Sequence, residues 1–200
     1  IETLEQAVTL APDRIALFGY AHVPHLLPRQ RRIDEAALPH EGERFAMAAL
    51  GHDYLVDHGY QPVGFDHFAR PGDPLAIAAR EGRLHRNFQG FTDDSAEHLI
   101  GMGASAISQL PGLYAQNAKN AGEYRTAVAQ GRLPIERGVA RDAESRNCGA
   151  LINAILCHGE GTLPANLSPA QQETLDEFAR RGLISTGSGM IRLRAQAMPY

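Results

Sequence analysis

Cysteine and long apolar runs are scarce in this chain of 200 residues. Its two cysteines, Cys148 and Cys157, are too few for a disulfide framework. They lie in an apolar, helical segment, so we expect them in the core, and free thiols favour a cytoplasmic location. No apolar run approaches the ~20 residues that cross a bilayer. The first residues, IETLEQAV, lack the basic and apolar regions of a signal peptide.

An excess of positive charge is also missing. Nineteen lysines and arginines face 23 acidic residues, giving a net charge of −4. This balance argues against a nucleic-acid partner, which favours a basic excess. The exception is local: residues 67–92, HFARPGDPLAIAAREGRLHRNFQGFT, gather four arginines (Arg70, Arg80, Arg83 and Arg86) among aromatic residues. A local cluster favours a small anion over a polymer.

The periodicity of apolar residues predicts an α/β fold. Residues 13–22, DRIALFGYAH, resemble a strand buried on both faces, as in parallel sheets. A second strand is expected at 60–68, although Pro62 favours an edge position. Asp73 and Pro74 are typical of the start of a short helix. Longer helices are expected at 41–58 and 113–130.

The pattern changes near residue 135. Residues 141–158 have helical spacing, and Ser168, Pro169 and Gln171 predict a capped helix that ends at Gly182. Residues 183–194, LISTGSGMIRLR, alternate around a Gly/Ser turn as a β-hairpin does. Helices followed by a hairpin favour a small, winged-helix-like module.

Two apparent motifs carry little weight. The pairs His22/His25 and His52/His58 have no partner at a metal-ligand spacing, so no metal site is predicted. The segment GMGASA, 101–106, matches the dinucleotide fingerprint G-x-G-x-x-A without its βαβ surroundings. The same small residues would also allow the backbone to approach a ligand closely.

The arginine-rich stretch allows two interpretations. Arginine pairs bidentately with carboxylates and phosphates, Asn87 and Gln89 add neutral hydrogen-bonding groups, and Phe88 and Phe91 offer apolar surface. Alternatively, the stretch is a solvated loop whose arginines pair with neighbouring acids, namely Asp66, Asp73 and Glu81.

Three segments resemble successive motifs of one enzyme family: 18–33 (FGYAHVPHLLPRQRRI), 64–92 (GFDHFARPGDPLAIAAREGRLHRNFQGFT) and 98–108 (HLIGMGASAIS). The family is that of the oxygen-independent coproporphyrinogen III oxidases, or dehydrogenases. The similarity runs from about residue 1 to 120 and weakens beyond. The pattern LHRNFQGFT distinguishes the chain from the related heme chaperones.

The resemblance implies a radical S-adenosylmethionine enzyme of heme biosynthesis. Its members convert two propionates of coproporphyrinogen III to vinyl groups, which gives protoporphyrinogen IX. It implies the last part of a partial (β/α) barrel at 1–135, followed by the winged-helix-like module at 136–200. A substrate with four carboxylates on a large apolar ring matches a cluster of arginines and aromatic residues.

The resemblance also carries over site residues. Ala21 and Ile107 match family positions that contact S-adenosylmethionine, and Tyr20 and His22 flank the first of them. The remaining predicted contacts to pocket or substrate are Arg70, Arg86, Asn87 and Gln89. The resemblance names no catalytic residue and no electron donor.

The chain departs from the family in two respects. It lacks the Cys-x-x-x-Cys-x-x-Cys motif that holds the [4Fe–4S] cluster, so we expect a C-terminal fragment, clipped at both ends and inactive alone. Where the family has a basic RRD-like segment, this chain has CGAL, Cys148 to Leu151. A barrel cut within its sheet exposes an edge and favours self-association. The alternatives are a heme chaperone of the same superfamily and a non-catalytic anion-binding module.

Overall fold

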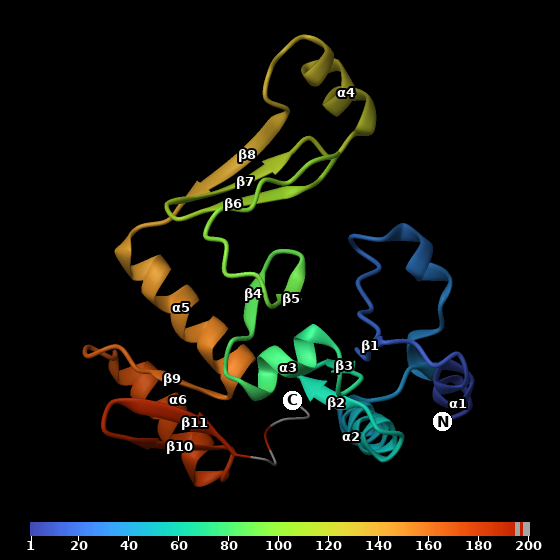
Figure 1. Ribbon diagram of the computed structural model, residues 1–200, viewed down its shortest axis with the longest axis vertical. Helices are drawn as coiled ribbons and strands as arrows, with labels where there is room; N and C mark the ends of the chain where they lie inside the picture. Colours follow the sequence, from blue (N-terminus) through green and yellow to red (C-terminus); the bar gives the residue numbers. More distant parts are fainter. Residues whose placement is uncertain (195–196, 198–200) are drawn as a thin grey trace.

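The computed structural model describes residues 1–194 and 197. The fold is α/β, built from small sheets that helices connect (Figure 1). Strand pairs in the described residues are antiparallel. Within those residues, no helix is both long and apolar enough to cross a membrane.

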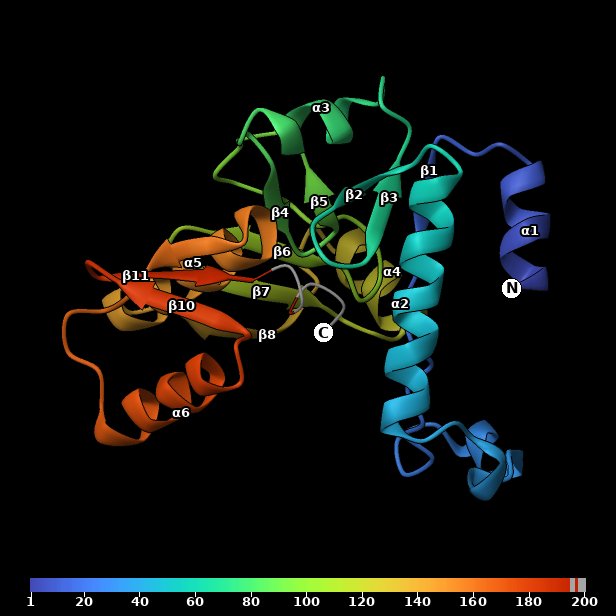
Figure 2. The same ribbon diagram turned by 90° about the horizontal axis from the view of Figure 1, so that it is seen from below.

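Two helices cover the N-terminal part. α1 (Glu2–Thr9) packs against α2 (Glu41–Asp57), as Figure 2 shows. The loop between them contains the 3-10 helices η1 (Pro28–Arg32) and η2 (Glu35–Ala37). A capping box of His40 and Glu43 starts α2, and Gly59 follows its end at φ 81°, which confirms the predicted helix.

The first sheet differs from the one expected. β1 covers only Arg14–Ala16 and pairs antiparallel with β3 (His67–Ala69), whose other neighbour is β2 (Gln61–Val63). The predicted strand 13–22, buried on both faces, is therefore wrong: two of the three β1 residues are exposed. The predicted single strand at 60–68 is a hairpin. Its turn includes Gly64 at φ 66°, where an added Cβ would overlap the ring of Phe91.

The short helix α3 (Pro74–Arg80) starts where it was predicted. The carboxylate of Asp73 accepts the N–H of Leu75 at 2.8 Å, and Pro74 is the first helical residue. The same carboxylate accepts the Nε–H of Arg14 on β1, also at 2.8 Å. Asp73 therefore joins the start of α3 to the first sheet.

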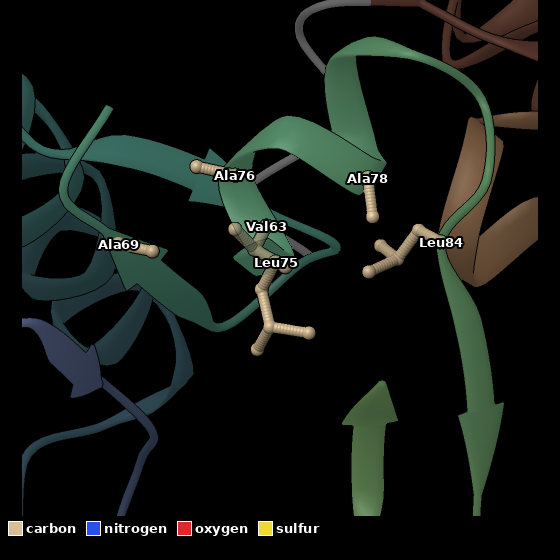
Figure 3. Close-up of a cluster of buried hydrophobic side chains, with 6 residues drawn as sticks. All are labelled: Val63, Ala69, Leu75, Ala76, Ala78 and Leu84. Atoms are coloured by element: carbon tan, nitrogen blue, oxygen red, sulfur yellow. The ribbon is translucent and has the colours of Figure 1, made fainter. Parts of the chain in front are cut away.

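The core lies where this helix meets the sheet. Figure 3 shows the six buried side chains of one cluster, which come from β2, β3, α3 and the segment before β4: Val63, Ala69, Leu75, Ala76, Ala78 and Leu84. A second cluster joins Leu55 of α2 with Tyr60 and with Phe68 of β3. Burial of this apolar surface anchors the arginine-rich stretch at both ends.

Two further sheets follow. β4 (His85–Asn87) and β5 (Gly90–Thr92) form a hairpin, which lies between the first sheet and the sheet of β6 (Ile107–Leu110), β7 (Leu113–Asn117) and β8 (Ile135–Ala140) (Figure 1). The predicted helix 113–130 is wrong in its first half. Its first five residues form β7, and the helix α4 (Ala121–Ala129) starts only after Asn120, which caps it.

The C-terminal part matches its predicted elements. α5 (Ala143–His158) leads to β9 (Glu160–Thr162), and α6 (Pro169–Arg180) begins with the capping box of Ser168 and Gln171. β10 (Ile184–Gly187) and β11 (Met190–Leu193) form the predicted hairpin, which β9 extends to three strands. Residues 195, 196 and 198–200 of the predicted module lie outside the described residues.

One expectation for this part is wrong. Cys148 is exposed on α5, and only Cys157 is partly buried, against the core cluster. The two thiols lie nine residues apart, two and a half helical turns, and so point to different faces of α5.

Replacement of Asp73 tests the link between α3 and the first sheet. Burial raises the pKa of Asp73, but the bonds from Arg14 and Leu75 outweigh it and leave that pKa below its ordinary value of 3.8. Asp73→Asn keeps a capping oxygen but loses the ion pair. We expect about 1 kcal/mol less stability to urea at neutral pH.

The same link predicts a dependence on pH. Because the folded-state pKa is depressed, the stabilisation exists above pH 3.8 and fades as the pH falls through the lower folded-state value. The difference between wild type and Asp73→Asn should therefore shrink in acid. Asp34→Asn is the control, since Asp34 caps η2 without a described ion pair. A difference that persists at low pH would contradict the ion-pair account.

Candidate functional site

Tyr20, Ala21 and His22 lie together in the loop after β1. The hydroxyl of Tyr20 is 3.1 Å from Nδ1 of His22, and the ring centroids are 5.9 Å apart. Tyr20 is exposed and His22 is half-buried. The two side chains that flank Ala21 therefore contact each other.

Gln30 holds this loop in place, a role that the sequence analysis missed. Its Nε2 donates to the carbonyl of Ala21 at 3.0 Å, and its Oε1 accepts the N–H of Val23 at 2.6 Å. Gln30 lies on η1, so this short helix determines the path of the backbone at Ala21.

Arg70 is held by an aromatic ring. Its guanidinium lies over the ring of Tyr60, 4.4 Å from the centroid. Tyr60 is buried, and its hydroxyl donates to the carbonyl of Pro12 at 2.7 Å. The half-buried Arg70 therefore rests on a rigid aromatic surface.

The hairpin of β4 and β5 carries three more predicted residues. Arg86 lies opposite Phe91, with its guanidinium 6.0 Å from the ring centroid. The Oδ1 of Asn87 accepts the N–H of Gln89 at 2.7 Å and so stabilises the turn, while Gln89 is exposed. The hairpin therefore brings Arg86, Asn87 and Gln89 together.

The acidic neighbours of this stretch pair with other groups. Asp66 contacts His67 at 2.6 Å, Asp73 pairs with Arg14, and Glu81 pairs with Arg83. Arg70 and Arg86 have no carboxylate partner in the described part of the chain. The interpretation as a neutralised loop is thus correct for Arg83 but not for Arg70 or Arg86.

Ile107 begins β6, directly after the loop 101–106. The buried amide of Asn117 fixes this loop: its Nδ2 donates to the carbonyls of Gly101 and Gly103, each at 3.0 Å. The hydroxyl of Tyr124 accepts the N–H of Gly103 at 3.0 Å. An added Cβ at Gly101 would lie 2.7 Å from the carbonyl oxygen of Ile107, so glycine is needed for this close approach.

The loop 101–106 is followed by a strand, β6, and not by a helix. The dinucleotide fingerprint requires a helix N-terminus at that point to bind the pyrophosphate. The match to that motif is therefore accidental. Gly101 allows two backbone segments to approach each other closely, while the close approach to a ligand stays a prediction.

The predicted residues thus form three groups: the loop 20–22, the hairpin with nearby Arg70, and Ile107 on β6. Within the described residues, no hydrogen bond or ring contact joins Ala21 to Ile107. Phe88 links the hairpin to the sheet of Ile107, because its ring meets Tyr114 on β7 edge-on at 4.7 Å.

The residues present do not fit an iron–sulfur cluster. Such a cluster needs several converging thiolates, whereas Cys148 is exposed and Cys157 is partly buried on another face of α5. Burial raises the pKa of the Cys157 thiol, although nearby Arg86 opposes this. No group of three His, Cys, Asp or Glu side chains suited to a metal occurs in the described ranges.

Comparison with known proteins gives a consistent result. No protein-family model matches the chain. The oxygen-independent coproporphyrinogen III oxidase of Cereibacter sphaeroides is 45% identical over 163 residues, 82% of this chain and 36% of that protein. The protein of the same name from Bradyrhizobium diazoefficiens is 41% identical over 195 residues, 96% of this chain and 43% of its own length.

A solved structure extends this likeness to the fold. Coproporphyrinogen III oxidase from Escherichia coli, described as a radical SAM enzyme, is 34% identical with a TM-score of 0.84. The match covers 99% of this chain and 48% of that one. The chain is a homologue of the oxygen-independent coproporphyrinogen III oxidases. It spans less than half of these oxidases and matches their C-terminal part.

Replacement of Asn117 tests the support of the loop before Ile107. Asn117→Ala leaves two carbonyls without their donor in a partly buried place, which costs about 1–3 kcal/mol of unfolding free energy. Gln116→Ala is the matched control, because the amide of Gln116 donates to Ser105 in an exposed position. Its cost should stay below about 1 kcal/mol in urea unfolding. Equal losses would contradict a special role for Asn117.

Proposed function

We propose that this chain is the C-terminal part of an oxygen-independent coproporphyrinogen III oxidase. In the complete protein it helps convert two propionates of coproporphyrinogen III to vinyl groups, and alone it is inactive. The observation that carries this proposal is the match at 45% identity over 82% of the chain, together with the shared fold over 99% of it. The cytoplasmic location stays a prediction.

Residues 1–135 belong to the late part of a partial (β/α) barrel in this proposal, and residues 136–200 form a winged-helix-like module. The three-stranded sheet of β9, β10 and β11 beside α6 supports the second assignment. The boundary falls within β8, which pairs with β7, so this strand connects the two parts. The free edges of the short sheets favour self-association of the isolated chain.

We assign S-adenosylmethionine to a site that includes Ala21 and Ile107, with Tyr20 and His22 beside Ala21. Gln30 and Asn117 support this assignment, because they hold the backbone at Ala21 and in the loop before Ile107. When bound, S-adenosylmethionine supplies the radical that starts the reaction. The iron–sulfur cluster belongs to the part of the enzyme outside these 200 residues, since the thiols here do not fit it.

The substrate carboxylates are the proposed partners of Arg70 and Arg86. Both guanidinium groups rest on aromatic rings and lack a carboxylate partner in the described residues, so their charge is available for an anionic ligand. Asn87 and Gln89 add hydrogen-bonding groups at the tip of the same hairpin. Asn87 does so with its amide nitrogen, because its oxygen is engaged in the turn.

The experiment is an anaerobic assay of the protein that the complete gene encodes. We expect conversion of coproporphyrinogen III to protoporphyrinogen IX that requires S-adenosylmethionine and a reductant. Tight heme binding without decarboxylation would instead favour the heme chaperone. Binding of simple phosphates, with neither porphyrinogen nor heme, would favour the anion-binding module.

A single substitution tests the arginine assignment in the same assay. Arg86→Gln removes the charge but keeps polarity, and should raise KM about tenfold because a charge-assisted bond to substrate is lost. Arg83→Gln is the control, since Arg83 is exposed and already paired with Glu81. Unchanged kinetics for Arg86→Gln would contradict a role of this residue in binding the substrate.

A further inference from the structure

A second group of arginines surrounds a cavity away from the predicted residues. The cavity is a shallow pocket, open to solvent, of about 270 Å³, where the turn between β6 and β7 meets the start of α5. Figure 1 shows where these elements lie. Six residues line it: Glu97, Gln109, Leu110, Pro111, Arg141 and Arg146.

Arg141 is held at this cavity through its backbone and its side chain. Its backbone N–H donates to the carbonyl of Gly112 at 2.9 Å, and its guanidinium lies over the ring of Tyr114, 4.5 Å from the centroid. Its Nη2 also lies close to Gly149, where an added Cβ would be 2.9 Å away. The position of the guanidinium is therefore largely set before any ligand arrives.

Arg146 lies near the start of α5, whereas Arg141 precedes this helix. Its Nη1 donates to the carbonyl of Arg141 at 2.8 Å, which holds the two arginines together. Neither guanidinium forms an ion pair with a carboxylate within hydrogen-bond distance in the described ranges. The charge of Arg146 acts on nearby Asp142, but the two form no ion pair. The carboxylate of Asp142 instead accepts the N–H of Ser145 as the cap of α5.

We propose that this cavity binds a carboxylate group carried on a short alkyl chain. Two guanidinium groups and one carboxylate, Glu97, leave a single positive charge among the lining residues, which suits a monoanionic carboxylate better than a dianionic phosphate. Gln109 provides a neutral donor, and Leu110 and Pro111 provide apolar surface for the alkyl part. The proposal stands independently of the proposed function.

Titration of the 200-residue chain with butyrate, a monocarboxylate with a short alkyl chain, followed by NMR, tests this. We expect saturable shifts of the Arg141 and Arg146 side-chain Nε–H signals, which weaken at high salt. Arg146→Gln should weaken binding about three- to tenfold. Arg125→Gln is the matched control, because it removes an exposed arginine of α4 outside the cavity and should change nothing.

Glu97→Gln should change the binding affinity in the opposite direction. A gain in affinity cannot result from misfolding of the variant. Glu97 is exposed and its removal takes a repelling charge from the cavity, so butyrate should bind about two- to fivefold more tightly. Absence of a saturable response in the wild type would overturn the proposal. Equal effects of the Arg146 and Arg125 substitutions, no gain in Glu97→Gln, or tighter binding of inorganic phosphate than of butyrate would do so too.

Discussion

The carboxylate of Asp73 is the group on which the arrangement of the arginine-rich stretch depends. It caps α3 and pairs with Arg14 of β1, so it fixes the helix against the first sheet. The backbone supports the same junction, because Asp73 donates its N–H to the carbonyl of Arg70, and Arg70 donates to that of Asp13. The side chains of α3 then form the core with Leu84, from which the hairpin of Arg86 extends. The side chain and the backbone of Asp73 together thus support the part of the fold that carries both predicted arginines.

Local chemistry made the helix ends predictable. Asp73, Pro74 and the pair Ser168/Gln171 act through hydrogen bonds within a few residues, and the structure confirms each. β7 was predicted as helix, although Pro111 and Gly112, the two-residue turn between β6 and β7, are a hairpin signal. The other partner, β8, lies about 20 residues further along the chain. All six β8 residues are exposed, so their sequence has no alternation that marks a strand.

The charged residues of the site could be predicted from the sequence, but the side chains that hold its loops in place could not. Arginines and aromatic residues can be read from composition and motif, and the described contacts bring them together. Gln30, Asn117 and Tyr124 bind backbone groups 7 to 21 residues away. Such bonds arise only when a loop takes its final path, so the sequence alone gives no spacing that indicates them. The two amides Gln116 and Asn117 in the otherwise apolar segment LYAQNA, 113–118, were the available signal.

Three arginines share one arrangement, in which the guanidinium lies over an aromatic ring. Arg70, Arg86 and Arg141 lie over Tyr60, Phe91 and Tyr114, and none of them forms an ion pair in the described residues. A ring fixes the guanidinium plane without neutralising its charge, and it leaves the N–H edge free for a planar oxyanion. A carboxylate partner would have occupied that edge. Stacking on aromatic rings therefore allows a chain with a net charge of −4 to keep local sites for anions.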